Sequence, residues 1–203
     1  MADISIEQIK KLKELTGVGL TDAKVALVDT GGDFDKALEE MRKKGLTKAE
    51  KRGEREAREG LIESYVHGGR IGVLVELNCE TDFVARTDEF KTLAHEIAMQ
   101  IAAMNPKWPT YDQVPEEEIS RKQSELETTF ANDAKNAKKP ADVRAKIIDG
   151  QLKKYFAELV LDEQTYWKDE TKTIDQLIKE YIAKLGENIV VRQFSRIELG
   201  VSE

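Results

Sequence analysis

Residues 61–78 read LIESYVHGGRIGVLVELN, two apolar and β-branched runs on either side of Gly68-Gly69. Runs of this kind are typical of strands, and a two-glycine loop supplies the positive φ angles that a tight hairpin turn needs. The stretch therefore predicts an antiparallel hairpin with strands over residues 61–67 and 70–78. The rest of the fold has to be arranged around this hairpin.

The chain after the hairpin changes to a helical period. We predict a helix that begins at about Thr87 and ends at Asn105-Pro106. Apolar residues recur on one face of this helix: Phe90, Leu93, Ala94, Ile97, Ile101 and Met104. Beyond an acidic and weakly apolar stretch, 112–135, we expect a helix over 141–160, a helix from Thr173 to Leu185 and a strand over 188–199. The pattern predicts an α+β core with a small antiparallel sheet packed by helices.

The chain before the hairpin predicts a three-helix module. The first helix begins at Ser5, with Gln8 completing a capping box, and carries Ile6, Ile9, Leu12 and Leu15 on one stripe. We expect Thr21 to cap the second helix, and Asp33 to cap a third that ends at Gly45. The predicted inward residues of these two helices are Ala23, Ala26, Leu27, Phe34, Ala37, Leu38 and Met41.

A basic segment joins the module to the hairpin. Residues 42–58 hold eight Lys or Arg against three acidic residues, with almost no large apolar side chain. A solvated linker helix is the favoured interpretation, because the run lacks the interleaved aromatic residues that single-stranded nucleic acid binders use for stacking. We therefore predict a module with its linker over residues 1–55 and a core domain over residues 56–203.

Composition excludes several classes of protein. The 203 residues carry a net charge of −7 and one cysteine, which argues against a nucleic acid coat protein and against a disulfide framework. No stretch approaches the ~18 apolar residues of a membrane span, and the first residues lack a secretory apolar region. We expect a cytoplasmic protein with no membrane and no direct nucleic acid partner.

Motifs for chemistry are few. Gly17-Val18-Gly19 lacks the third glycine of a dinucleotide fingerprint and follows a helix, and the chain contains no phosphate-binding loop. His67 and His95 lack zinc-ligand spacing, and Cys79 is best interpreted as a small buried hydrophobe. An acidic set does not match a calcium loop: Glu76, Glu80, Asp82 and Asp88. We expect no metal, no cofactor and no enzymatic activity.

Thr81-Asp82-Phe83-Val84 lies at the corner between the second strand and the following helix. In one interpretation Phe83 packs into the core and Asp82 caps the helix. In the other, an aromatic anchor and a carboxylate are presented together to a partner. The residues alone leave both interpretations open.

Three segments resemble the elongation factor Ts family, the guanine-nucleotide exchange factors of the translation GTPase elongation factor Tu. They are residues 12–27 (LKELTGVGLTDAKVAL), 76–86 (ELNCETDFVAR) and 185–200 (LGENIVVRQFSRIELG). The resemblance implies an N-terminal ubiquitin-associated-like module, a linker and an α+β core of the dimerisation type. It implies the short form of the family, with one core repeat and no long coiled-coil insertion.

The resemblance also implies roles for particular residues. Thr81, Asp82, Phe83 and Val84 match the segment that dislocates magnesium in elongation factor Tu. The module is expected to dock on that GTPase through positions that include Leu12, Val18, Gly19 and Leu20. Short family members suggest a homodimer in a two-to-two complex with the GTPase. One segment, Gln164-Thr165-Tyr166-Trp167, departs from the family pattern.

Two other classes stay open from the residues. A ubiquitin-associated-like module is able to bind a ubiquitin-like protein or act in a chaperone complex, but the second and third motifs have no role there. An enzyme with carboxylate chemistry is the third class, and the lack of a nucleophile–base pair counts against it.

Overall fold

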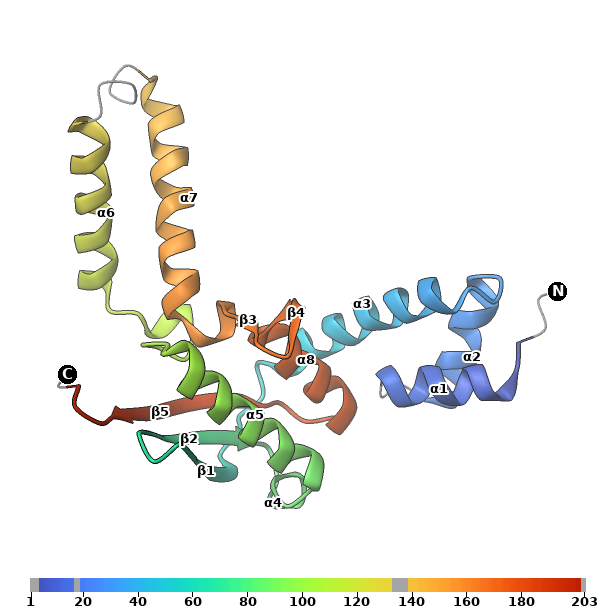
Figure 1. The fold of residues 1–203 in the computed structure, drawn as a ribbon. Helices are drawn as coiled ribbons and strands as arrows, with labels where there is room; N and C mark the ends of the chain where they lie inside the picture. The colour runs from blue at the N-terminus through green and yellow to red at the C-terminus, as the bar shows by residue number, and fades with distance from the viewer. Residues whose placement is uncertain (1–3, 17–18, 133–138, 202–203) are drawn as a thin grey trace. The chain divides into compact units, whose positions relative to one another are not determined.

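The fold is seen in a computed structural model that describes residues 4–16, 19–132 and 139–201 (Figure 1). Its contacts divide the chain into two compact units, one of residues 1–102 with 175–203 and one of residues 103–174. The boundary predicted near residue 55 lies inside the first unit and stays a prediction. None of the helices in the described ranges is long and apolar enough to cross a membrane.

The first unit is built on a three-stranded antiparallel sheet with the order β1-β2-β5. Strands β1 (Glu59–His67) and β2 (Ile71–Cys79) form the predicted hairpin, in register from Glu59 opposite Cys79 to His67 opposite Ile71. Gly68 and Gly69 make the turn with φ of 56° and 69°, a conformation that glycine adopts without a steric cost. Strand β5 (Val190–Glu198) pairs with the other edge of β2 and confirms the predicted last strand.

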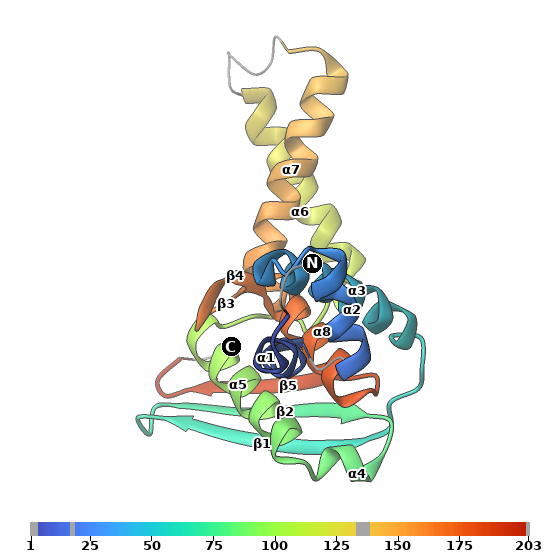
Figure 2. The same cartoon turned by 90° about the vertical axis from the view of Figure 1, so that its right-hand side faces the viewer.

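Helices cover one face of this sheet, as Figure 2 shows. Alternate residues of β2 are buried on the side of helix α5 (Asp88–Met104). The predicted helix and its apolar face are confirmed except at Met104, which is exposed. Helix α8 (Ile174–Leu185) lies on the same side of the sheet and leads into β5. The opposite face of the sheet stays open, with four exposed apolar side chains, Ile62, Val66, Leu74 and Ile197. The predicted α+β class is therefore confirmed.

The N-terminal module contains helices α1 (Ile6–Thr16), α2 (Leu20–Asp29) and α3 (Phe34–Arg52). Ser5 and Gln8 make the predicted capping box, because each backbone N–H donates to the side chain of the other. The predicted stripe of α1 is wrong in part: Leu12 is buried, whereas Ile6 and Leu15 are exposed. Steps of three residues drift by about 60° around a helix of 3.6 residues per turn, so four such positions cannot share one narrow buried stripe.

Two helix boundaries in the module differ from the expectation. Helix α2 is capped by Gly19 rather than Thr21, which lies inside the helix. Helix α3 begins at the predicted cap, since the Lys36 N–H donates to the Asp33 carboxylate, but it runs through Gly45 to Arg52. An interior glycine costs a helix only about 1 kcal/mol, which the good helix formers after Gly45 offset.

The second unit centres on two helices, of which the sequence predicted only the second. Helix α7 (Ala141–Leu159) was expected, but α6 (Glu116–Asn132) lies in the acidic and weakly apolar stretch 112–135, for which no helix was predicted. The two helices lie side by side, although the resemblance implied no long coiled-coil insertion. Phe156 is fully buried at their base, with the rings of Trp108, Tyr111 and Tyr155 around it.

The segment that departs from the family pattern forms part of a small hairpin in the second unit. Strands β3 (Thr165–Tyr166) and β4 (Asp169–Thr173) pair in antiparallel orientation. The same unit contains the short 3-10 helices η1 (Tyr111–Gln113) and η2 (Leu161–Glu163). Gln164 is buried, and its side-chain amide donates to the Glu158 carbonyl at 2.8 Å. Gln164 is therefore a structural residue in this unit.

Candidate functional site

The candidate site is the corner at which β2 ends and the short helix α4 (Asp82–Ala85) begins. Thr81 is the N-cap, with extended backbone angles, and its hydroxyl accepts a hydrogen bond from the Val84 N–H at 3.4 Å. Ala85 is buried, which anchors the inner side of the turn. Thr87 then closes the corner by donating to the Val84 carbonyl and capping α5 through the Phe90 N–H. Local capping therefore fixes where both helices start.

Cys79 supports the corner from inside. Its thiol is fully buried and donates to the Thr81 carbonyl at 3.1 Å. Burial, together with the nearby negative charge of Glu187, raises the pKa of the Cys79 thiol to about 11. The predicted role of Cys79 as a small buried residue is confirmed.

A second support comes from the junction between α8 and β5, more than a hundred residues along the chain. One carboxylate oxygen of Glu187 accepts from the backbone N–H groups of Glu80 at 3.1 Å and Thr81 at 3.0 Å. The other oxygen accepts from the Thr81 hydroxyl at 2.6 Å. In return, the Glu80 carboxylate accepts from the Asn188 N–H at 2.7 Å. Each segment therefore satisfies backbone donors of the other.

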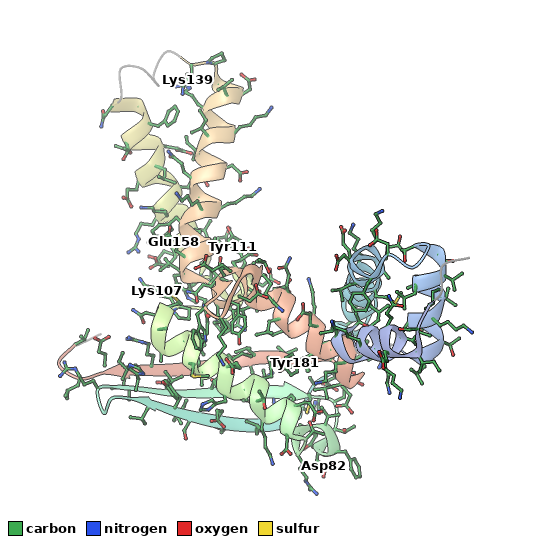
Figure 3. All side chains as sticks on the ribbon, turned by 45° about the vertical axis from the view of Figure 1, so that its right-hand side comes forward. Asp82, Lys107, Tyr111, Lys139, Glu158 and Tyr181 are labelled. Atoms are coloured by element: carbon green, nitrogen blue, oxygen red, sulfur yellow. The ribbon has the colours of Figure 1, made fainter. Side chains whose placement is uncertain are left out.

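Phe83 and Asp82 are presented outward from this supported corner. Phe83 is 79% exposed, so the interpretation that places it in the core is wrong. Asp82 is the first residue of α4 rather than its cap, and its carboxylate pairs with Arg86 at 2.7 Å. Figure 3 shows Asp82 at the outer corner of α4, directed away from the sheet. An exposed aromatic ring beside a carboxylate is an arrangement suited to binding a partner.

The residues expected to dock through the module have different positions. Leu20 is exposed at the start of α2, next to Gly19, and Leu15 and Val25 are exposed on the same module. Leu12 has no exposed surface, because it lies in the core of the module with Ala23, Ala26, Leu27, Ala37 and Met41. Val18 lies outside the described residues. Leu20 and Gly19 are thus available to a partner, whereas Leu12 holds the module together.

Other chemistry-bearing side chains are engaged in separate contacts. His95 contacts Glu63 at 2.9 Å, and the Nδ1 atom of His67 contacts the Tyr65 hydroxyl at 2.9 Å. Across the described ranges, no three His, Cys, Asp or Glu side chains are grouped as a metal-ligand set. The corner at residues 81–84 is therefore the strongest candidate site.

Comparison with known proteins identifies the family. The model of the family described as elongation factor TS matches residues 26–200. This chain belongs to the elongation factor Ts family. It is 50% identical to the elongation factor Ts of Syntrophomonas wolfei, covering 97% of this chain and 91% of that protein. It is 51% identical to that of Thermotoga petrophila, covering 98% and 97%, and 50% identical to that of Caldanaerobacter subterraneus, covering 97% and 97%.

Membership of the elongation factor Ts family makes this chain a translation elongation factor. The three motifs quoted from the sequence fall on the helical module, the corner and the α8–β5 junction. The residues that sequence reasoning missed are Glu187 and Asn188. Both residues belong to the third motif. Their partners, Thr81 and Glu80, lie 106 and 108 positions earlier in the chain, and a hydrophobic periodicity carries no information about contacts at such separations. The sequence did indicate that a helix ends at Gly186, immediately before these two residues.

Proposed function

We propose that this protein is a guanine-nucleotide exchange factor that binds elongation factor Tu in its GDP-bound form and promotes GDP release and GTP loading. The observation that carries the proposal is the exposure of Phe83, a residue that is 79% exposed, on a corner whose backbone is held by Cys79 and Glu187. Membership of the elongation factor Ts family supports the identity of the partner.

The proposed mechanism uses the corner as a wedge. Thr81 and Val84 define the turn, Phe83 displaces packed side chains near the magnesium site of the GTPase, and Asp82 competes electrostatically with groups around the ion. A bound Mg²⁺ is often the largest local charge in a phosphate site, so weakening its hold lowers the affinity for GDP. The factor makes or breaks no covalent bond in this scheme, so it is not an enzyme in the usual sense.

Exchange then follows from linkage between two ligands of one GTPase. A factor that lowers the nucleotide affinity of elongation factor Tu by some ratio is itself bound more weakly by the same ratio when nucleotide is present. The factor therefore binds the nucleotide-free GTPase best, and incoming GTP releases it. This cycle requires only differential binding.

The proposal is tested by stopped-flow release of labelled GDP from elongation factor Tu. Saturating amounts of this protein are expected to accelerate release by orders of magnitude, whereas the protein alone binds no nucleotide. An unchanged release rate at saturation contradicts the proposal. Capture of a ubiquitin-like protein instead of elongation factor Tu from a bacterial lysate supports the alternative binding module.

We assign docking to the N-terminal module, with Gly19 and Leu20 at its contact surface and Leu12 in its core. The exposed Leu20 side chain gives this surface the apolar character that partner surfaces use. Val18 belongs to the same motif and is proposed with them. The module adds affinity, and the corner at residues 81–84 performs the displacement. A cytoplasmic location, without membrane or nucleic acid partners, accords with this role.

We further propose a homodimer that brings the open sheet faces of two copies together in a two-to-two complex. The face presents Ile62, Val66, Leu74 and Ile197, each more than half exposed. On the same face the Gln193 amide donates a hydrogen bond to the Glu76 carboxylate at 2.8 Å. A C2 dimer pairs the same patch on both subunits, so an exposed apolar patch suits it.

A further inference from the structure

We propose that Glu187 is the positioning residue for the Thr81–Val84 segment, and that its carboxylate holds the segment in the conformation that binds the partner. The inference rests on the proposed exchange function and deepens it. Glu187 follows Gly186, which ends α8 with a φ of 86°, and so enters the corner from the α8–β5 junction. It acts through Thr81 and does not itself belong to the presented surface.

Three hydrogen bonds make the carboxylate the central acceptor of the corner. It accepts hydrogen bonds from the backbone N–H groups of Glu80 and Thr81 and from the Thr81 hydroxyl, at 3.1, 3.0 and 2.6 Å. These are charge-assisted bonds, which are stronger than bonds between neutral groups. An ionised carboxylate accepts on both oxygens and donates on neither, so it fits this set of three donors.

The bond to the Thr81 hydroxyl also determines what that hydroxyl does next. Because its single proton is donated to Glu187, its lone pairs are directed elsewhere, and one accepts from the Val84 N–H. That second bond is the N-cap of α4. Glu187 therefore orients the cap from which α4 starts, and α4 carries Asp82 and Phe83.

The exposed ring of Phe83 makes this support necessary. A side chain that is 79% exposed has few contacts of its own, so its direction depends on the backbone beneath it. A mobile segment would have to be ordered when the partner binds, and that ordering weakens the affinity. Cys79 holds the Thr81 carbonyl on one side of the turn, and Glu187 holds the N–H groups on the other.

The test compares Glu187→Gln with a matched control, Glu170→Gln, which makes the same charge change at an exposed residue of β4. Glutamine keeps the shape of Glu187 but has one acceptor oxygen and an amide donor facing the donors of the corner. We expect amide hydrogen exchange at Glu80, Thr81 and Val84 to accelerate at least about tenfold in the free variant. The control is expected to leave these amides unchanged.

In GDP release from elongation factor Tu, Glu187→Gln is expected to raise the half-saturating concentration of the factor by about tenfold or more. Thr81→Val replaces the hydroxyl with a methyl group of similar size, and it keeps the test valid if Glu187→Gln folds poorly. Since both changes break the same bond, the double variant is expected to lose less than the product of the two single losses.

Each result decides a different question. A wild-type protein that does not accelerate GDP release contradicts the proposed function. An active wild type with an equally active Glu187→Gln overturns the positioning role. Reduced activity with unchanged protection at Thr81 and Val84 also overturns it, because Glu187 would then act on the partner directly. Independent, multiplying losses in the Thr81→Val double variant overturn it as well.

Discussion

At the scale of single residues, the corner at 81–84 combines an exposed ring with a buried support. Phe83 lies outside the core, whereas Cys79, two residues before Thr81, is fully buried. Interface residues of this kind are expected to affect binding more than folding, and buried supports the reverse. The two predictions at this scale separate these roles.

Asp82→Asn is expected to slow GDP release most when Mg²⁺ is abundant, because the proposed role of the carboxylate is to weaken the hold on that ion. The pair that Asp82 makes with Arg86 is exposed, and such pairs contribute little to stability, so the melting temperature should barely change. Arg86→Gln is the control: it breaks the same ion pair and keeps the carboxylate. A magnesium dependence equal to that of Asp82→Asn in this control would contradict the role.

Cys79, the single cysteine, is expected to resist iodoacetamide in the folded protein at pH 8–9 and to react rapidly once the chain is unfolded. Burial raises the pKa of its thiol from 9.0 to about 11, so the native thiol stays protonated where the unfolded one ionises. Because the folded protein favours the protonated thiol, the contribution of Cys79 to the free energy of unfolding is complete below pH 9.0 and is lost as the pH rises through about 11. Fast native-state alkylation would contradict the buried geometry.

At the scale of elements, the sequence predicted what local chemistry determines. The Gly68-Gly69 hairpin, the Ser5–Gln8 capping box and the apolar face of α5 follow from turn residues, caps and periodicity, and all are confirmed. Helix α6 was missed because its one buried side chain, Phe130, and the partly buried Ile119 and Leu126 are spread among charges.

The support of the corner by Glu187 was missed for a different reason. The carboxylate meets its donors across 106 residues, and such a contact exists only after the sheet has formed. The exposure of Phe83 was left open by the sequence for the same reason, since only the packed α5 and sheet show that the core is complete without it.

Gly19→Ala tests the docking surface of the module. Gly19 has an ordinary φ of −66°, and an added Cβ would meet only the Asp22 carboxylate at 3.8 Å. The melting temperature of Gly19→Ala is therefore expected to equal that of the wild type. If the partner approaches this backbone closely, the affinity for elongation factor Tu falls. Gly31→Ala is the contrasting variant, because a φ of 65° costs a side chain roughly 1–2 kcal/mol of stability. Unchanged affinity in Gly19→Ala would remove Gly19 from the docking surface.

At the scale of the whole molecule, the assembly is expected to depend on the open face of the sheet. Ile62→Asp places a charge on the proposed dimer interface at a position that is 70% exposed in one chain, so folding should be preserved. Sedimentation equilibrium is expected to show at least a thirtyfold weaker dimer, as for loss of an interface anchor of ~2 kcal/mol. Ile6→Asp, at 72% exposure in the module, is the matched control. A dimer that survives Ile62→Asp would exclude this face.

The most direct measurement of the central claim is GDP release from elongation factor Tu by Phe83→Ala, with thermal unfolding of the same sample. We expect an unchanged melting temperature and at least a roughly thirtyfold loss of apparent affinity for the GTPase, the size expected for an anchor of ~2 kcal/mol. Val143→Ala, an exposed apolar change in α7, should alter neither quantity. A destabilised Phe83→Ala whose folded fraction still promotes normal release would contradict the account.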